Sequence, residues 1–241
     1  GLVNWQRAVK SDTEITYMKR AGKVIEGVYE RVMKVAKPGM RKNDLVAEIM
    51  HAGVQGHQGH YGDYTSFVPL IGAGDEAAAC HMTWNDQQLN NNEGMFLELA
   101  GAYARYHCPC SRTLFLGSPP QQYLDIEKVI SECIENAISM FKPGNTCAEI
   151  SDNFTATLKK YGYEKNNRCG YPIGLSYPPD WGERTMSLRG TDQTILQENM
   201  TFHFMPAIWF DDWGFEMTES IRVGENGGEC LSKVPRQLLV K

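Results

Sequence analysis

The sequence of 241 residues lacks several features that would place it in a specialised class of protein. It has no window of eighteen apolar residues, so a membrane-spanning helix is not expected. It has no long basic run and a formal net charge of −5, which argues against nucleic-acid binding, because that binding needs a cationic surface. No signal peptide is visible, and the chain begins at Gly1 rather than Met, which we interpret as processing or a missing upstream part.

The cysteines show no pattern of a disulfide scaffold or a zinc site. The seven cysteines form an odd, scattered set, which is typical of a reduced protein, so a cytoplasmic location is expected. Cys108 and Cys110 flank Pro109, but no second Cys or His pair lies at zinc-binding spacing. We therefore interpret both as small side chains within a strand.

What the sequence does contain is one pattern written twice. Ser11 and Glu14 form a predicted capping box, and apolar residues at helical spacing run from there to Val35. Lys37-Pro-Gly39 ends this helix. A second apolar helical face follows at 45–50, and strand-like segments follow at 67–74, 95–107 and 111–117.

The pattern restarts at Ser118, with an apolar helical face over 123–141 that Lys142-Pro-Gly144 ends. Thr146 and Glu149 form a second capping box, and strand-like segments follow at 200–210 and 214–224. The two Lys-Pro-Gly motifs have the same offset as Glu93-Gly-Met95 and Glu198-Asn-Met200. This predicts a duplicated α+β unit, with halves at about 11–117 and 118–226 of one domain covering 1–241. Antiparallel sheets should lie inside and helices outside, with a ligand site between the sheets.

Several motifs resemble those of the pita-bread superfamily, which includes methionine aminopeptidase, prolidase, aminopeptidase P and creatinase. Besides the Lys-Pro-Gly helix ends, they are Gly101-Ala-Tyr103 before Ser111-Arg-Thr113, Gly170-Tyr-Pro-Ile-Gly174, and Pro178-Pro-Asp-Trp-Gly-Glu183. The resemblance covers nearly the whole chain and implies the pita-bread fold. It also implies a homodimer, and an additional N-terminal domain that is absent from this chain.

The metallopeptidases of that superfamily hold two metal ions with five ligands. The resemblance places those five positions at Glu98, Pro109, Tyr171, Met205 and Glu219. Proline and methionine supply no hard oxygen or imidazole donor, and two carboxylates with one phenol do not restore the set. We therefore expect no metal and no other cofactor.

Among metal-free members, the sequence looks most like the ectoine hydrolases. The resemblance implies hydrolysis of the cyclic amidine ectoine to N-acetyl-diaminobutyrate, with Glu98 as nucleophile or primary base and with His81 and Glu219 handling protons and orientation. An amidinium presents N–H donors that carboxylates accept in charge-assisted bonds, so the acidic positions suit such a small-molecule substrate. The alternatives are a creatinase-like amidinohydrolase, and a catalytically dead module that binds peptides or a partner protein.

Five further residues are predicted to contact the substrate. Tyr171 replaces a ligand histidine and is able to donate a hydrogen bond, and Trp181 is placed to stack on a flat cation. Arg105 and His107 share a face if their strand is regular, where they reach the substrate carboxylate or pair with acidic residues. His203 occupies the position of Glu98 in the second repeat, which predicts that it faces the pocket.

The carboxylates of Glu216 and Glu219 are expected on opposite sides of their strand. They are three residues apart, and side chains of a regular strand alternate between its faces. A bulge would undo this inference. With Glu219 assigned to the active site, Glu216 is expected to point away from it.

Overall fold

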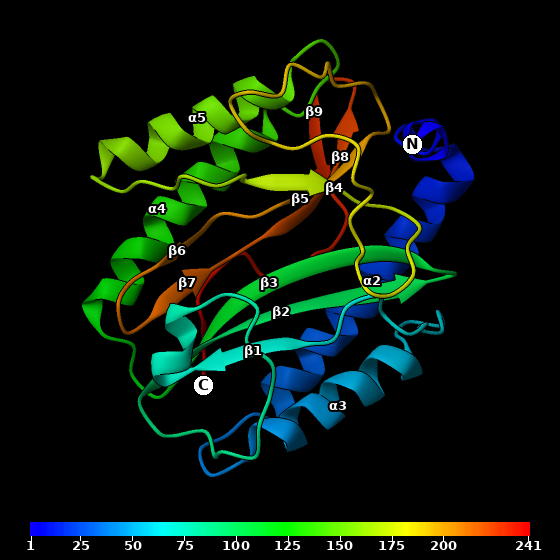
Figure 1. The fold of residues 1–241 in the computed structure, drawn as a ribbon. Coiled ribbons are helices and arrows are strands. Elements are labelled where there is room, and N and C mark those ends of the chain that lie inside the picture. The colour runs from blue at the N-terminus through cyan, green and yellow to red at the C-terminus, as the bar shows by residue number, and fades with distance from the viewer.

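The computed structural model describes residues 1–241, and its first half packs helices on one face of a sheet. After the short α1 (Leu2–Gln6), Ser11 caps α2 (Asp12–Val35) in a complete capping box with Glu14, as predicted. The helix α3 (Lys42–Gln55) follows, and α2 and α3 lie together against the sheet formed by β1, β2 and β3 (Figure 1).

The first sheet has the strand order β1-β2-β3-β10. Its strands are β1 (Leu70–Ala73), β2 (Glu93–Tyr103), β3 (Tyr106–Leu116) and the short β10 (Leu239–Val240), and the 3₁₀ helix η1 (Gly74–Ala78) follows β1. The strands β1, β2 and β3 pair antiparallel, whereas β10 joins β3 in parallel. The C-terminal segment therefore completes the sheet of the N-terminal half.

The second half repeats this plan. Its helices are α4 (Gln121–Ile138) and α5 (Cys147–Lys160), and Thr146 with Glu149 forms the second predicted capping box. Its strands are β4 (Gly170–Pro172), β5 (Thr201–Phe204), β8 (Glu219–Gly224) and β9 (Gly227–Cys230) in the order β4-β5-β8-β9, with a separate hairpin of β6 (Ala207–Trp209) and β7 (Gly214–Glu216). The α4–α5 pair lies on the outer side of these strands in Figure 1. No helix of the protein combines the length and apolarity that crossing a membrane requires.

Hydrogen bonds join the two halves along β3. The Ser111 amide donates to Thr218 Oγ1 at 2.8 Å, and the Thr218 amide donates to the Ser111 carbonyl at 3.1 Å. Ser220 Oγ donates to the Pro109 carbonyl at 2.6 Å. This seam fixes the segment between β7 and β8 directly beside β3, so side chains of the two halves meet there.

Each half has its own hydrophobic core. The two largest buried clusters contain 28 and 27 residues, the first around α2 and α3 and the second around α4 and α5. Cys108 and Cys110 belong to the first cluster, and all seven cysteines are free. The interpretation of this pair as packed strand side chains is therefore confirmed, as is the α+β architecture.

Candidate active site

A cavity of about 370 Å³ is lined by side chains from both halves of the protein. The first half contributes Phe67, Leu70, Cys80, His81 and Glu98. The second half contributes Lys165, Asn167, Arg168, Tyr171, Asp180, Trp181, Arg189, Met205, Trp209 and Glu216. Four of the eight predicted site residues (Glu98, His81, Tyr171 and Trp181) are therefore brought together here, whereas Glu219, Arg105, His107 and His203 do not line the cavity.

Glu98 is an almost fully buried carboxylate in the middle of the first sheet. It lies on β2 between Leu70 of β1 and Ser111 of β3, and only 5% of the residue is exposed. Burial raises its pKa well above the usual range, the nearby Glu216 carboxylate raises it further, and the Lys165 ammonium opposes both effects. Glu98 is thus an acidic group whose ionisation depends on what else occupies the cavity.

Glu216 is the second buried carboxylate of the cavity. Its backbone is held against β3 by Thr113, whose hydroxyl accepts from the Glu216 amide at 2.8 Å and donates to the Glu216 carbonyl at 3.0 Å. Burial raises the pKa of Glu216 to about 7, although Lys165 and the Ser111 hydroxyl act to lower it. A carboxyl group with a pKa near neutrality can both accept and donate a proton at physiological pH.

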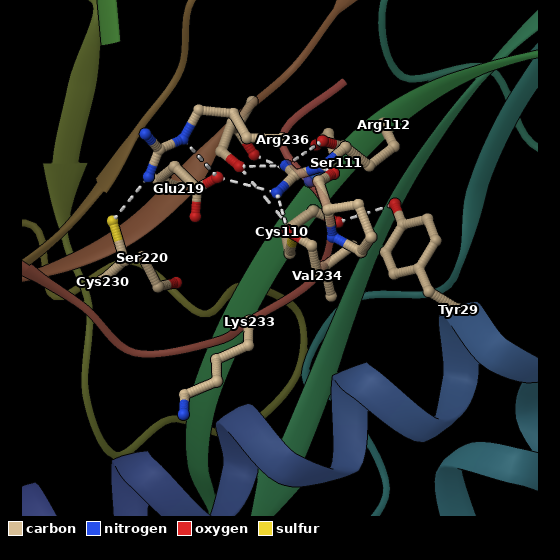
Figure 2. Close-up of polar contacts among 12 residues, drawn as sticks. Tyr29, Cys110, Ser111, Arg112, Glu219, Ser220, Cys230, Lys233, Val234 and Arg236 are labelled. Carbon is tan, nitrogen blue, oxygen red and sulfur yellow. Dashed lines mark hydrogen bonds and ion pairs between the residues drawn. The ribbon is translucent and has the colours of Figure 1, made fainter. Parts of the chain in front are cut away.

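The expected placement of Glu219 in the site is not found. Its Oε1 atom forms a buried ion pair with Arg112 Nη2 at 2.7 Å and lies 3.3 Å from Arg236 Nε (Figure 2). Glu216 and Glu219 do not share one regular strand, as the prediction assumed, because Glu216 ends β7 and Glu219 begins β8 in a different sheet. Glu216 faces the cavity, while Glu219 neutralises a buried arginine that also binds the Val234 carbonyl of the C-terminal segment.

Lys165 brings a positive charge to the two carboxylates. It lies in the loop between α5 and β4, and its Nζ atom donates to the Met205 carbonyl at 2.8 Å and sits 5.2 Å from the centre of the Trp209 ring. Burial lowers the pKa of Lys165, whereas the Glu216 carboxylate raises it. Sequence reasoning missed this residue, because nothing in the local pattern of the loop marks one of its polar side chains as inward-facing.

Tyr171 and Trp181 form a hydrogen-bonded aromatic wall of the cavity. Trp181 Nε1 donates to the Tyr171 hydroxyl at 2.7 Å, and that hydroxyl lies 3.0 Å from His203 Nδ1. His203 does not face the cavity, which corrects the prediction from the repeat. It is completely buried behind Tyr171, with Nε2 2.7 Å from Thr218 Oγ1, and burial lowers its pKa to about 3. The imidazole is therefore neutral and supports the tyrosine.

His81 is the only histidine that lines the cavity. It lies in the loop after η1 with a φ of 62°, and its ring centroid is 6.1 Å from that of Phe67. Positive φ is uncommon for residues other than glycine and clusters at functional sites, which is consistent with a constrained role for this loop. The imidazole is exposed where it lines the cavity.

Arg105 and His107 bind a loop of the protein instead of lining the cavity, which corrects their predicted contact with substrate. Arg105 lies in the two-residue turn between β2 and β3, with a φ of 67°, and its guanidinium contacts Ser66 Oγ at 3.0 Å and Asp63 Oδ1 at 3.5 Å. His107 Nε2 accepts from the Ser66 amide at 2.9 Å, and burial lowers its pKa to about 4. The condition for a shared strand face is not met, because Arg105 lies in the turn before β3, whereas the alternative of pairing with an acidic residue holds for Arg105.

The mouth of the cavity is cationic. It opens into a larger hollow of about 780 Å³, and Arg168, Tyr171, Asp180 and Arg189 line both spaces. Asp180 lies 3.3 Å from Arg184, which lines only the outer hollow. Arg168 stacks over the Tyr171 ring at 4.5 Å, and neither it nor Arg189 forms an ion pair within the protein. Two guanidinium groups are therefore free to bind an anionic group at this entrance.

The residues present do not fit a divalent metal. Of the five positions that correspond to metal ligands, Pro109, Tyr171 and Met205 offer no carboxylate or imidazole, and Glu219 is bound to Arg112. Nowhere in the chain do three or more His, Cys, Asp or Glu side chains group in a way that could hold a metal ion. Only Glu98 is left of the expected donor set.

Comparison with known proteins places the chain in a family. Residues 16–226 match the family described as "Metallopeptidase family M24". An ectoine hydrolase from Halomonas elongata is 50% identical over 246 residues, which cover 100% of this chain and 62% of that protein. An uncharacterized hydrolase/peptidase from Sinorhizobium fredii is 40% identical, over 100% of this chain and 61% of its own length. The chain thus spans less than two thirds of these relatives.

Solved structures share the fold. The X-Pro aminopeptidase from Thermotoga maritima superposes with a TM-score of 0.90 at 20% identity, covering 100% of this chain and 66% of that one. A dipeptidase from Pyrococcus horikoshii gives a TM-score of 0.89 at 22% identity, covering 100% of this chain and 65% of that one. Matched in sequence by its relatives along its whole length, the chain belongs to metallopeptidase family M24 and has the pita-bread fold.

Proposed function

We propose that the protein hydrolyses ectoine, opening its cyclic amidine to N-acetyl-diaminobutyrate without a metal ion. The observation that carries this proposal is the separation of charge along the cavity. Glu98 and Glu216 line only the inner part, whereas Arg168 and Arg189 lie where the cavity meets the outer hollow. The similarity to the Halomonas elongata ectoine hydrolase supports the same conclusion.

Ectoine matches this separation of charge. It is a zwitterion in which a flat, cationic cyclic amidine carries a carboxylate. The amidinium N–H groups are able to donate to the inner carboxylates in charge-assisted bonds, and the substrate carboxylate is able to accept from Arg168 and Arg189. The indole of Trp181 provides an aromatic face for the cationic ring.

The two inner carboxylates supply the chemistry. The Glu98 carboxylate attacks the amidine carbon, forming a C–O bond and a covalent adduct. Glu216 or His81 protonates the ring nitrogen, which leaves as its C–N bond breaks. Water then adds to the same carbon and gives its proton to Glu216, and the C–O bond to Glu98 breaks. Overall one C–N bond breaks, a C=O bond forms, both hydrogens of water end on the released amine, and Glu98 is regenerated.

Metal independence is part of the proposal, and the donor set supports it. Glu98 and Glu216 do not belong to any group of three or more His, Cys, Asp or Glu side chains that could hold a metal, whereas a divalent ion needs several hard ligands. The inner cavity also already contains the Lys165 ammonium. The reaction is therefore written through side chains alone.

The test is ring opening of ectoine by the purified protein in the presence of a chelator, followed by nuclear magnetic resonance. We expect turnover that Glu98→Gln abolishes and that Glu164→Gln, an exposed carboxylate just outside the cavity, leaves unchanged. Absence of ring opening, or activity that depends on added metal, contradicts the proposal. Creatine with urea detection separates a creatinase-like activity, and binding of peptides without binding of small amidines would indicate a binding module.

A further inference from the structure

Lys165 is a half-buried cation of the cavity that the proposed reaction does not use. It lines the inner cavity together with Glu98 and Glu216. The cavity's remaining ionisable groups are Cys80, His81, Arg168, Tyr171, Asp180 and Arg189, of which Arg168, Tyr171, Asp180 and Arg189 also line the outer hollow. Lys165 is thus the one cation of the cavity that lies away from the mouth shared with the outer hollow, and with Asn167 and Trp209 it also lines a separate hollow of about 350 Å³.

The protein holds this ammonium in a defined place. One of its three N–H donors is bound by the Met205 carbonyl at 2.8 Å, and the ring centres of Trp209 and Phe154 lie 5.2 and 6.0 Å from Nζ. A carbonyl oxygen and two aromatic faces all attract a cation. The remaining N–H groups are not bound by protein atoms, so they are free to face the cavity.

Lys165 forms no ion pair with either carboxylate. The tightly buried pairs of the protein involve other acids, Glu183 with Lys10 at 2.8 Å and Glu219 with Arg112 at 2.7 Å. Lys165 nevertheless acts on both cavity carboxylates, since its charge opposes the effect of burial on each of them. A cation that is close but not in contact balances the acids while leaving their oxygens open to a substrate.

We propose that Lys165 is the internal counter-ion of the Glu98–Glu216 pair, taking the role that a bound metal ion has in metallopeptidases of this family, so that the pair carries a negative charge before the substrate arrives. The inference rests on the proposed hydrolysis and adds a positioning residue to it. Two carboxylates in one desolvated cavity cannot both ionise without compensating positive charge. The amidinium of the substrate supplies one such charge, and Lys165 supplies the other before and after the amidinium is bound.

The experiment compares Lys165→Met and Lys165→Arg with the wild-type protein, using kcat and KM for ectoine. We expect Lys165→Met to lower kcat by about 100-fold with a much smaller change in KM, because it changes the charge state of the carboxylate pair and not the substrate contacts. Lys165→Arg should retain part of the activity. Lys160→Met, which removes an exposed lysine of α5 paired with Glu132, is the matched control and should behave as wild type.

Chemical rescue separates this role from a structural one. Ethylammonium ions should restore part of the activity of Lys165→Ala, because they place a positive charge in the space left by the side chain. Manganese or zinc ions should not do so. Rescue by a metal and not by the amine, or equal kcat for Lys165→Met and wild type, overturns the inference.

A binding measurement keeps the inference testable if the wild-type protein does not hydrolyse ectoine. Calorimetry in two buffers of different ionisation enthalpy counts the protons released when acetamidinium binds. Lys165→Met should release more protons than wild type, because without the lysine the empty cavity holds more protons on its carboxyl groups. Equal proton release by the two folded proteins contradicts the role of Lys165, whereas failure to open ectoine contradicts only the proposed function.

Discussion

Thr113 and Glu216 exchange two hydrogen bonds across the seam between the halves of the protein. The Glu216 amide donates to Thr113 Oγ1 at 2.8 Å, and Thr113 Oγ1 donates to the Glu216 carbonyl at 3.0 Å. Because β7 is only three residues long, this clasp is a main determinant of where the Glu216 carboxylate lies. The position of the proposed proton carrier therefore depends on one hydroxyl group of β3.

Replacing Thr113 with Val should impair catalysis and stability together. The substitution keeps the shape of the side chain but leaves the Glu216 amide and carbonyl without their partner, which costs about 1–3 kcal/mol of unfolding free energy. The displaced carboxylate should lower kcat by about 10-fold or more. Thr157→Val is the matched control, since it removes a buried hydroxyl of α5 that bonds the Asn153 carbonyl at 2.9 Å. It should lower stability and leave kcat unchanged; a normal kcat for Thr113→Val would refute the positioning role.

Substitution of Glu219 should affect stability, whereas substitution of Glu216 should affect catalysis. Glu219→Gln leaves the buried Arg112 without its counter-ion, so urea unfolding should show a loss of about 3 kcal/mol, while kcat of the folded protein stays close to wild type. Glu216→Gln should lower kcat by about 100-fold without destabilising the protein. The reverse result, with Glu219→Gln inactive but stable, would return the catalytic role to Glu219.

The sequence predicted those features that depend on local chemistry. Both capping boxes, the helices they begin and the duplicated arrangement follow from hydrogen-bonding side chains and from spacing along the chain. Glu216 and Glu219 belong to two different strands, so the alternation within one strand does not decide their placement. Which of the two faces the cavity depends on how Thr218 docks against Ser111, and no local pattern contains that information.

The other missed residues have a similar explanation. Lys165 and Arg168 lie in the loop between α5 and β4, where no periodicity indicates which side chains turn inward. Their positions depend on groups distant in the sequence, such as the Met205 carbonyl that binds Lys165. His203 occupies the position of Glu98 in the second repeat, but it lies behind Tyr171. In the second half Tyr171 lines the cavity, whereas in the first half Glu98 itself does so.

The buried Glu216 carboxyl should make the protein less stable as the pH rises. Burial raises its folded-state pKa from 4.5 to about 7, so the folded state binds more protons than the unfolded state between these values. This stabilising contribution is complete below the unfolded pKa and is lost as the pH rises through about 7, and its full size is about 3 kcal/mol. Urea unfolding at pH values of about 5 and 8 should therefore show that the free energy of unfolding of Glu216→Gln, relative to that of wild type, is higher at the higher pH. A constant difference between the two proteins would show that Glu216 titrates normally.

Arg168 and Arg189 should select substrates that carry a carboxylate. Each is a guanidinium at the cavity mouth without a partner in the protein, so Arg168→Gln or Arg189→Gln should raise the KM for ectoine by about 10- to 100-fold, the loss expected for a charged hydrogen bond. The methyl-substituted tetrahydropyrimidine that lacks the carboxylate presents the same amidine, so its turnover should be unaffected by either substitution. Arg184→Gln is the matched control, because Arg184 lines only the outer hollow and is paired with Asp180. An equal loss of activity on both substrates would mean that these arginines maintain the shape of the cavity and do not bind the substrate carboxylate.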